Sequence, residues 1–253
     1  MNDLDRAPEP TEPTPTASDT PLAEHDPRQM FADEPELTLE RASEGIDASV
    51  IRWSRKAGPG DRVVLLLHGL GADERDLVPL VPSLPDDFVY ASVRGIFTYG
   101  QGYAWLNFPL DETARAHISV SAAAVEGLID AIAQAGAQVV GVIGFSQGAM
   151  LTYELIRRRP GSLQFIAPLS GVPIPGELPA DASLAAAPKG DRIPAFWGCG
   201  GQDPFFPGDA LDHVRAWTDA HTDMTAVISP QLAHGIDPVI LDNLGRWLRD
   251  RAR

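Results

Sequence analysis

Short apolar runs alternate with amphipathic stretches along most of this chain. The run at 62–67, Arg-Val-Val-Leu-Leu-Leu, is apolar almost throughout, which is typical of a strand covered on both faces. Comparable runs predict further strands, and apolar residues at helical spacing predict helices between them. The expected strands lie at 88–93, 138–145, 164–169, 193–197 and 225–228, and the expected helices lie at 118–135, 147–159, 209–220 and 238–249.

The order of these elements predicts an α/β fold. Strands that alternate with helices form a mainly parallel sheet with helices on both faces. Two earlier stretches, 37–41 and 49–53, are expected to pair as antiparallel strands through a turn near Glu44 and Gly45, which makes the sheet mixed. A short helix is expected to follow the first buried strand, capped near Asp76, with its leucines and valine turned inward (Leu77, Leu80, Val81 and Leu84).

The segment 94–115 breaks this rhythm, because it is rich in glycine and aromatic residues. Long irregular loops are uncommon in compact domains and tend to be functional. We therefore expect this segment to be a wall or lid of the functional site. A surface excursion packed by its own aromatic side chains is the alternative.

The first 35 residues differ in composition from the rest of the chain. They hold seven prolines, nine acidic residues and two basic residues, so they carry −7 of the chain's net charge of −15. Large apolar residues are few there, and burial could not offset the entropy lost on ordering. We predict a disordered acidic tail over 1–35 and one α/β domain over 36–253. Docking of the tail to a basic partner is the alternative.

Composition also excludes several classes of function. The remaining charge of −8 disfavours nucleic-acid binding, because phosphates would be repelled. No apolar run approaches the roughly 18–20 residues that span a bilayer, so we expect no stable membrane insertion. The lone Cys199 excludes an internal disulfide and fits a reducing compartment, and the start of the chain does not have the pattern of a signal peptide, so we expect a cytoplasmic protein. The sequence leaves open whether the chain forms a homodimer.

The candidate chemistry begins at residues 144–148, Gly-Phe-Ser-Gln-Gly, which join an expected strand to an expected helix. This is the pattern of a nucleophile elbow, in which a serine occupies a strained strand-to-helix turn. Gly144 and Gly148 are expected there because a Cβ at either position would strike the neighbouring strand or helix. Taken alone, the motif also fits a helix start capped by Ser146.

A serine hydroxyl needs a base, and the base needs a third group to hold its tautomer. Sites on parallel sheets lie at the carboxyl ends of the strands. The loops that follow the strands 193–197 and 225–228 carry Asp203 and His234, and the order Ser146, Asp203, His234 is that of α/β-hydrolases. The sequence therefore predicts a catalytic triad, although separately each acid or histidine could be an ordinary loop residue.

Other reactive residues fit the pattern less well. His68 ends a strand at the expected edge, but it precedes the serine and opens a Gly-rich turn, so we assign it a structural or oxyanion-loop role. Cys199 has no glycine-flanked elbow and is interpreted as a packed residue. Main-chain amides suit a developing oxyanion, because they are fixed before the charge appears. We expect those of Gln147, directly after the nucleophile, and of Leu70 to form the oxyanion hole.

Four motifs together resemble the phospholipase/carboxylesterase family, which includes acyl-protein thioesterases. They are His-Gly-Leu-Gly-Ala-Asp at 68–73, Gly-Phe-Ser-Gln-Gly at 144–148, the segment from Trp-Gly to Asp-Pro at 197–204, and His-Gly-Ile at 234–236. The resemblance implies an α/β-hydrolase fold and the same triad and oxyanion amides, without a metal or cofactor. It also implies hydrolysis of short acyl esters, lysophospholipids or acyl thioesters.

The chain departs from that family pattern at Ala149, at Cys199 and at residues 105–107, Trp-Leu-Asn. We expect the last stretch to line the substrate pocket through Trp105 and Leu106, together with Phe108, so acyl preference stays open. The sequence as a whole predicts a serine hydrolase of carboxylic esters, either short acyl esters or lysophospholipids. An acyl thioesterase and a catalytically idle binding protein on the same fold are the alternatives.

Overall fold

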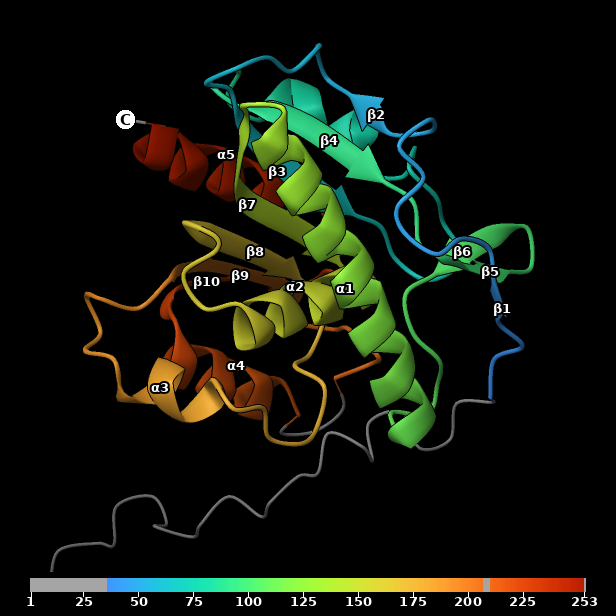
Figure 1. Ribbon diagram of the computed structural model, residues 1–253. Coiled ribbons are helices and arrows are strands. Elements are labelled where there is room, and N and C mark those ends of the chain that lie inside the picture. The colour runs from blue at the N-terminus through green and yellow to red at the C-terminus, as the bar shows by residue number, and fades with distance from the viewer. Residues whose placement is uncertain (1–35, 207–209, 253) are drawn as a thin grey trace, which may run out of the picture.

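The computed structural model describes residues 36–206 and 210–252. The expected tail, 1–35, lies outside the described residues. The described chain forms a seven-stranded sheet in the order β10-β9-β8-β7-β3-β4-β2, with neighbouring strands parallel except for β2 beside β4 (Figure 1). This confirms the predicted mainly parallel mixed sheet. Its strands are β2 (Arg52–Trp53), β3 (Arg62–Leu67), β4 (Val89–Val93), β7 (Gln138–Phe145), β8 (Phe165–Leu169), β9 (Pro194–Gly200) and β10 (Asp223–Ser229).

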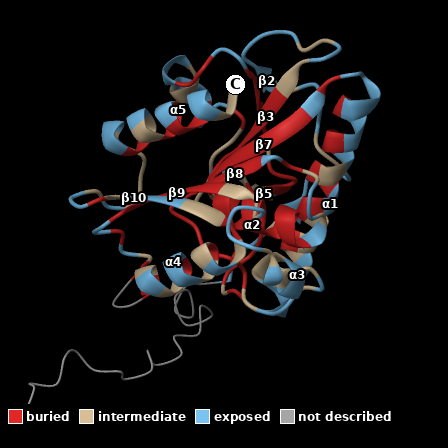
Figure 2. Ribbon diagram, turned by 90° about the vertical axis from the view of Figure 1, so that its left-hand side faces the viewer, coloured by how far each residue is buried: buried red, intermediate tan, exposed pale blue. Residues whose placement is uncertain are grey.

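Helices cover both faces of this sheet. Figure 2 shows α5 on one side of the strand layer and α1, α2 and α4 on the other, with the strands buried between them. The bounds are α1 (Glu112–Gln134), α2 (Gln147–Arg158), α3 (Asp181–Ala186), α4 (Ala210–His221) and α5 (Pro238–Ala252).

Alternate residues of β3 face the two cores. Val63, Leu65 and Leu67 pack in the cluster that includes α1, α2 and α4, whereas Val64 and Leu66 pack in the cluster with α5. Successive strand side chains point to opposite faces, so a strand covered on both sides must be apolar throughout. The continuous apolar run in the sequence is thereby explained.

The predicted antiparallel pair near the start of the domain was wrong. Both stretches contain strands, but β1 (Glu40–Arg41) pairs with β5 (Phe97–Tyr99), while β2 pairs with β4 of the main sheet. The error lies in assuming that neighbouring strands in the sequence pair with each other. β2 finds its partner at the open edge of the large sheet instead.

The segment expected as an irregular loop, 94–115, is more regular than predicted. It forms a hairpin of β5 and β6 (Gly102–Ala104), which joins β1 in a three-stranded sheet. Its last residues already belong to α1, which begins six residues before the predicted start. Asp111 caps this helix, since its carboxylate accepts hydrogen bonds from the amides of Thr113 and Ala114.

The expected helix after Asp76 is a 3₁₀-helix, η2 (Val78–Ser83), preceded by Leu77 rather than capped by the aspartate. Pro79 and Pro82 remove amide donors, and this disfavours a regular α-helix. Leu77 and Leu84 are buried as predicted.

Among the described residues, α1 is the one helix whose length and composition would allow it to cross a membrane. Charged residues interrupt its sequence, so it contains no uninterrupted apolar run of spanning length. Its inner face is buried against the sheet and α2, and outward Glu126 and Asp130 form ion pairs with Arg158 and Arg159. The apolar composition of α1 is therefore explained by its position as a helix that covers the core.

Candidate active site

Ser146 occupies a strained turn between β7 and α2, as the elbow pattern predicts. Its backbone has φ +54° and ψ −116°, a region that L residues rarely adopt. The two glycines make the bend possible. A Cβ on Gly144 would lie 2.2 Å from the Gly148 carbonyl oxygen, and one on Gly148 would lie 2.1 Å from that of Leu67. The close approach of α2 to the strands therefore requires glycine at both positions.

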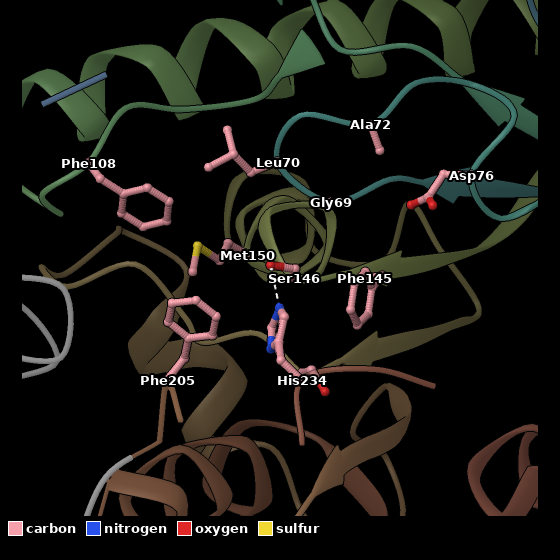
Figure 3. Close-up of a pocket in the computed structure, with 11 residues that line it drawn as sticks. Gly69, Leu70, Ala72, Asp76, Phe108, Phe145, Ser146, Met150, Phe205 and His234 are labelled. Carbon is pink, nitrogen blue, oxygen red and sulfur yellow. Dashed lines mark hydrogen bonds between the residues drawn. The ribbon is translucent and has the colours of Figure 1, made fainter. Parts of the chain in front are cut away.

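The structure brings Ser146, His234 and Asp203 together. His234 Nε2 lies 3.0 Å from Ser146 Oγ (Figure 3). His234 Nδ1 lies 2.8 Å from Asp203 Oδ2. A carboxylate only accepts, so Nδ1–H donates to Asp203 and Nε2 is left to accept from the serine hydroxyl. The three side chains follow β7, β9 and β10 at their carboxyl ends, which is the edge expected from the sequence.

The loops after β9 and β10 brace each other. The amide of Gly201 donates to the Ser229 carbonyl at 2.8 Å, and that of Gln202 donates to the Leu232 carbonyl at 2.9 Å. A Cβ on Gly200 would lie 2.2 Å from the Leu232 carbonyl oxygen, so the two loops touch through their backbones. This packing fixes Asp203 relative to His234.

Asp203 and His234 are held further by their neighbours. The Asp203 side chain is fully buried, and its second oxygen accepts a hydrogen bond from the amide of Phe205 at 3.0 Å. The rings of Phe145 and Phe205 lie 5.0 and 4.7 Å from the His234 ring, between centroids. The imidazole is thus confined to an orientation that joins the serine to the aspartate.

Ser146 opens onto a cavity of about 330 Å³. Figure 3 shows Leu70, Phe108, Met150 and Phe205 on one side of the serine, and Ala72, Phe145 and Asp76 on the other. The cavity is lined by Gly69, Leu70, Ala72, Asp76, Phe108, Phe145, Ser146, Met150, Ser170, Phe205 and His234.

The predicted pocket residues are only partly in place. Phe108 lines the cavity, but Trp105 and Leu106 do not, which corrects the expectation for these two. Both are completely buried, and the Trp105 indole donates to the carbonyl of His68 at 3.0 Å. Trp105 thus braces the strand end that precedes the site instead of meeting a substrate.

Gln147 explains why this segment turns inward. Its side-chain oxygen accepts from the Trp105 amide at 3.0 Å, and its side-chain nitrogen donates to the Leu106 carbonyl at 2.9 Å. The side chain therefore fastens the 105–106 backbone to the elbow, a contact that the sequence did not reveal. The main-chain amide of Gln147 stays at the start of α2, next to the serine.

Met150 and Phe205 are cavity residues that the sequence analysis missed. Met150 lies one helical turn beyond Ser146, and Phe205 lies two residues beyond Asp203. The helical spacing of Met150 from the serine is a signal that could have identified it. The local pattern around Asp76 predicts a helix cap and gives no sign that this residue lines the cavity.

The two amides expected to stabilise an oxyanion belong to a cavity-lining residue and to the residue that follows the serine. Leu70 lines the cavity, and the Gln147 amide begins α2. Within residues 36–206 and 210–252 neither amide donates to another group of the chain. Both amides are therefore without a partner in the described part of the chain, and the helix N-terminus adds a favourable dipole for a negative charge at Gln147.

The loop that carries Leu70 is pinned by two sets of contacts. Gly71 and Ala72 exchange backbone hydrogen bonds with Tyr103 of β6, both at 2.8 Å. Beyond them, buried Glu74 forms a two-pronged ion pair with Arg94, whose guanidinium also donates to the Tyr103 hydroxyl. The loop is thus fixed before any ligand arrives.

His68 and Cys199 have structural surroundings. The Nδ1 of buried His68 donates to the Gly69 carbonyl at 2.7 Å, its Nε2 accepts from the Gly95 amide, and burial lowers its pKa. Cys199 is buried in β9, where burial raises the pKa of its thiol to about 12. Neither lines the cavity. Over the described part of the chain, no group of three or more His, Cys, Asp or Glu residues is arranged to hold a metal ion.

Comparisons with known proteins give the same picture of the fold. The model of the phospholipase/carboxylesterase family matches residues 49–250. The carboxylesterase of Mesorhizobium loti is similar in structure, with a TM-score of 0.62 at 24% identity over 74% of this chain and 88% of that one. The Bacillus cereus carboxylesterase has a TM-score of 0.65 at 17% identity, over 81% and 96%. Esterase PE8 has a TM-score of 0.61 at 26% identity, over 85% and 97%.

Proposed function

Because the chain belongs to the phospholipase/carboxylesterase family and has the α/β-hydrolase fold, we propose that it is a serine hydrolase of small carboxylic esters. Ser146 is the nucleophile, His234 the general base and acid, and Asp203 the residue that orients the histidine. The observation that carries the proposal is the unbroken hydrogen-bonded chain from Ser146 Oγ through His234 to Asp203, at 3.0 and 2.8 Å.

The geometry supports the following reaction. The serine Oγ attacks the ester carbonyl carbon while its proton passes to His234 Nε2. Asp203 accepts the hydrogen bond from Nδ1–H and stabilises the imidazolium that forms. The carbonyl oxygen gains negative charge and accepts from the amides of Leu70 and Gln147.

Collapse of this intermediate breaks the bond to the leaving group. His234 returns its proton to the departing oxygen, and an acyl-enzyme on Ser146 remains. A water molecule, deprotonated by the same histidine, then attacks the acyl carbon and releases the carboxylic acid. Each step uses Nε2, and the fixed tautomer of His234 suits this order of transfers.

The cavity supports small acyl groups. Its volume of about 330 Å³ lies near the lower end of the range for ligand sites, and the side with Phe108 and Met150 is apolar. Esters with short acyl chains are therefore the preferred substrates of the proposal. A chain-length series of p-nitrophenyl esters should give the highest kcat/KM for short chains and a decline for long ones.

Two serine variants test the proposed nucleophile. Ser146→Ala should lower kcat for p-nitrophenyl acetate by several orders of magnitude, because among the described residues only this hydroxyl bonds to His234. Ser170 also lines the cavity, but no hydrogen bond joins it to the histidine among the described residues. Ser170→Ala should therefore stay within about tenfold of the wild type. Full activity in Ser146→Ala would refute the proposal.

A further inference from the structure

The two sides of the cavity differ in chemistry. The side formed by Phe108, Met150 and Phe205 is apolar and suits an acyl chain. The opposite side, where Figure 3 shows Asp76 beyond Phe145, ends at a carboxylate. An ester bound between them would place its acyl group on the first side and its leaving group on the second.

Among the described residues, Asp76 is the one acidic side chain that lines the cavity, and no lysine or arginine of that part of the chain lines it. The neighbouring acids are already paired, Asp73 with Arg75 and Glu74 with Arg94. Across the described residues no cation lies within ion-pair distance of Asp76. Its negative charge therefore acts on whatever occupies the cavity.

We propose that Asp76 selects the charge of the leaving group, favouring neutral or cationic alcohols and disfavouring anionic ones. This inference rests on the proposed hydrolase function and narrows its substrate class. Leaving groups that carry phosphates, such as coenzyme A, are among the anionic ones that Asp76 disfavours. Esters of uncharged alcohols should therefore be better substrates than acyl thioesters of coenzyme A.

The size of the effect follows from Coulomb's law. Asp76 is exposed, so water screens it strongly. For a leaving-group charge about 8 Å away in a largely aqueous medium, each unit charge should change kcat/KM by about threefold. Salt should weaken the effect, because the Debye length falls to about 4–5 Å at 0.5 M ionic strength.

The test uses three phenyl acetates that differ in charge at the para position: tert-butyl (neutral), trimethylammonio (cationic) and carboxylate (anionic). The acyl group is the same in all three. Intrinsic reactivity differs among the phenols, so the quantity compared is the ratio of kcat/KM in Asp76→Asn to that in the wild type, for each ester. A partly folded sample lowers all three ratios equally and leaves their differences intact.

Asp76→Asn should raise kcat/KM about threefold for the anionic ester, lower it about threefold for the cationic ester and leave the neutral ester unchanged. Asp76→Glu keeps the negative charge, so it should keep the wild-type order of kcat/KM among the three esters. Asp86 is an exposed acid just before β4, at the amino ends of the strands and thus away from the site at their carboxyl ends. Asp86→Asn makes the same change in net charge as Asp76→Asn and should leave all three ratios near one. In 0.5 M NaCl the Asp76→Asn ratios should move towards one.

The inference is overturned if Asp76→Asn changes all three esters by one common factor, or leaves the ratio of cationic to anionic ester unchanged. Failure of the proposed function looks different. In that case Ser146→Ala would hydrolyse the neutral ester as fast as the wild type, whatever Asp76 does.

Discussion

Gly148→Ala is a sharp test of how the elbow is built. The new Cβ would lie 2.1 Å from the Leu67 carbonyl oxygen and 2.8 Å from that of His68. These atoms belong to the backbone at the end of β3, and no side-chain rotation can relieve the contact. The first turn of α2 would have to move away from the sheet, and it would carry Ser146 and the Gln147 amide with it.

Gly127→Ala provides the matched control, because it makes the same change inside α1. A Cβ at Gly127 meets nothing within 4 Å. Replacing glycine by alanine in a helix interior stabilises by about 0.5–1 kcal/mol. For a domain of this size that raises Tm by about 1–4 °C.

At Gly148 the same gain in helix propensity opposes the cost of overpacking, which is about 1–3 kcal/mol. The net loss of about 0–2.5 kcal/mol should lower Tm by up to about 10 °C. Activity should fall further than stability does, because a misplacement of 1 Å at a reacting group costs about a hundredfold in rate.

Thermal unfolding followed by circular dichroism and hydrolysis of p-nitrophenyl acetate measure the two effects. The reasoning is refuted if Gly148→Ala melts at or above the wild-type temperature with unchanged kcat. A fall in Gly127→Ala as large as in Gly148→Ala would equally show that the contacts with the β3 backbone do not decide the outcome.

Two further predictions concern the surroundings of the site. Burial raises the pKa of the Cys199 thiol to about 12, so at pH 8 only about one molecule in 10⁴ should carry the thiolate. Iodoacetamide should therefore modify Cys199 only after the protein unfolds. Modification of the folded protein at the rate of a free thiol would contradict this prediction. Arg94→Met removes the closer of two ion-pair partners of buried Glu74 and leaves it only Arg52, at 3.8 Å, so it should cost about 1.5–3 kcal/mol of unfolding free energy. It should also lower kcat more than it raises KM, because the Leu70 loop loosens. The double variant Arg94→Met/Glu74→Leu should recover part of the stability, and equal stability of the single and double variants would argue against the ion pair.

The layers of the fold could be predicted because each buried strand carries its own signal. Val63 to Leu67 are apolar at every position, and only a strand between two cores requires this. The edge occupied by Ser146, Asp203 and His234 followed from the order of the elements, since Ser146 comes directly after β7 and the loops after β9 and β10 carry Asp203 and His234. Their proximity therefore needed no knowledge of tertiary contacts.

What could not be predicted depends on partners distant in the sequence. The stretches around Glu40 and Arg52 look like strands, but their partners are set by which sheet edges stay open after the rest has folded. Trp105 looked like a pocket residue, and only the side-chain contacts of Gln147 reveal why it faces inward. Asp76 lines the cavity, although its place before a helix-like pattern indicated a cap.

The most direct test of the central claim is to identify where an activated phosphonate reacts with the protein. After incubation with a fluorophosphonate, intact-mass measurement and peptide mapping should find one adduct per chain, on Ser146. His234→Ala should form it far more slowly, because the serine loses its base. An adduct on another residue, or ester hydrolysis by a protein that forms no adduct at Ser146, would contradict the assignment.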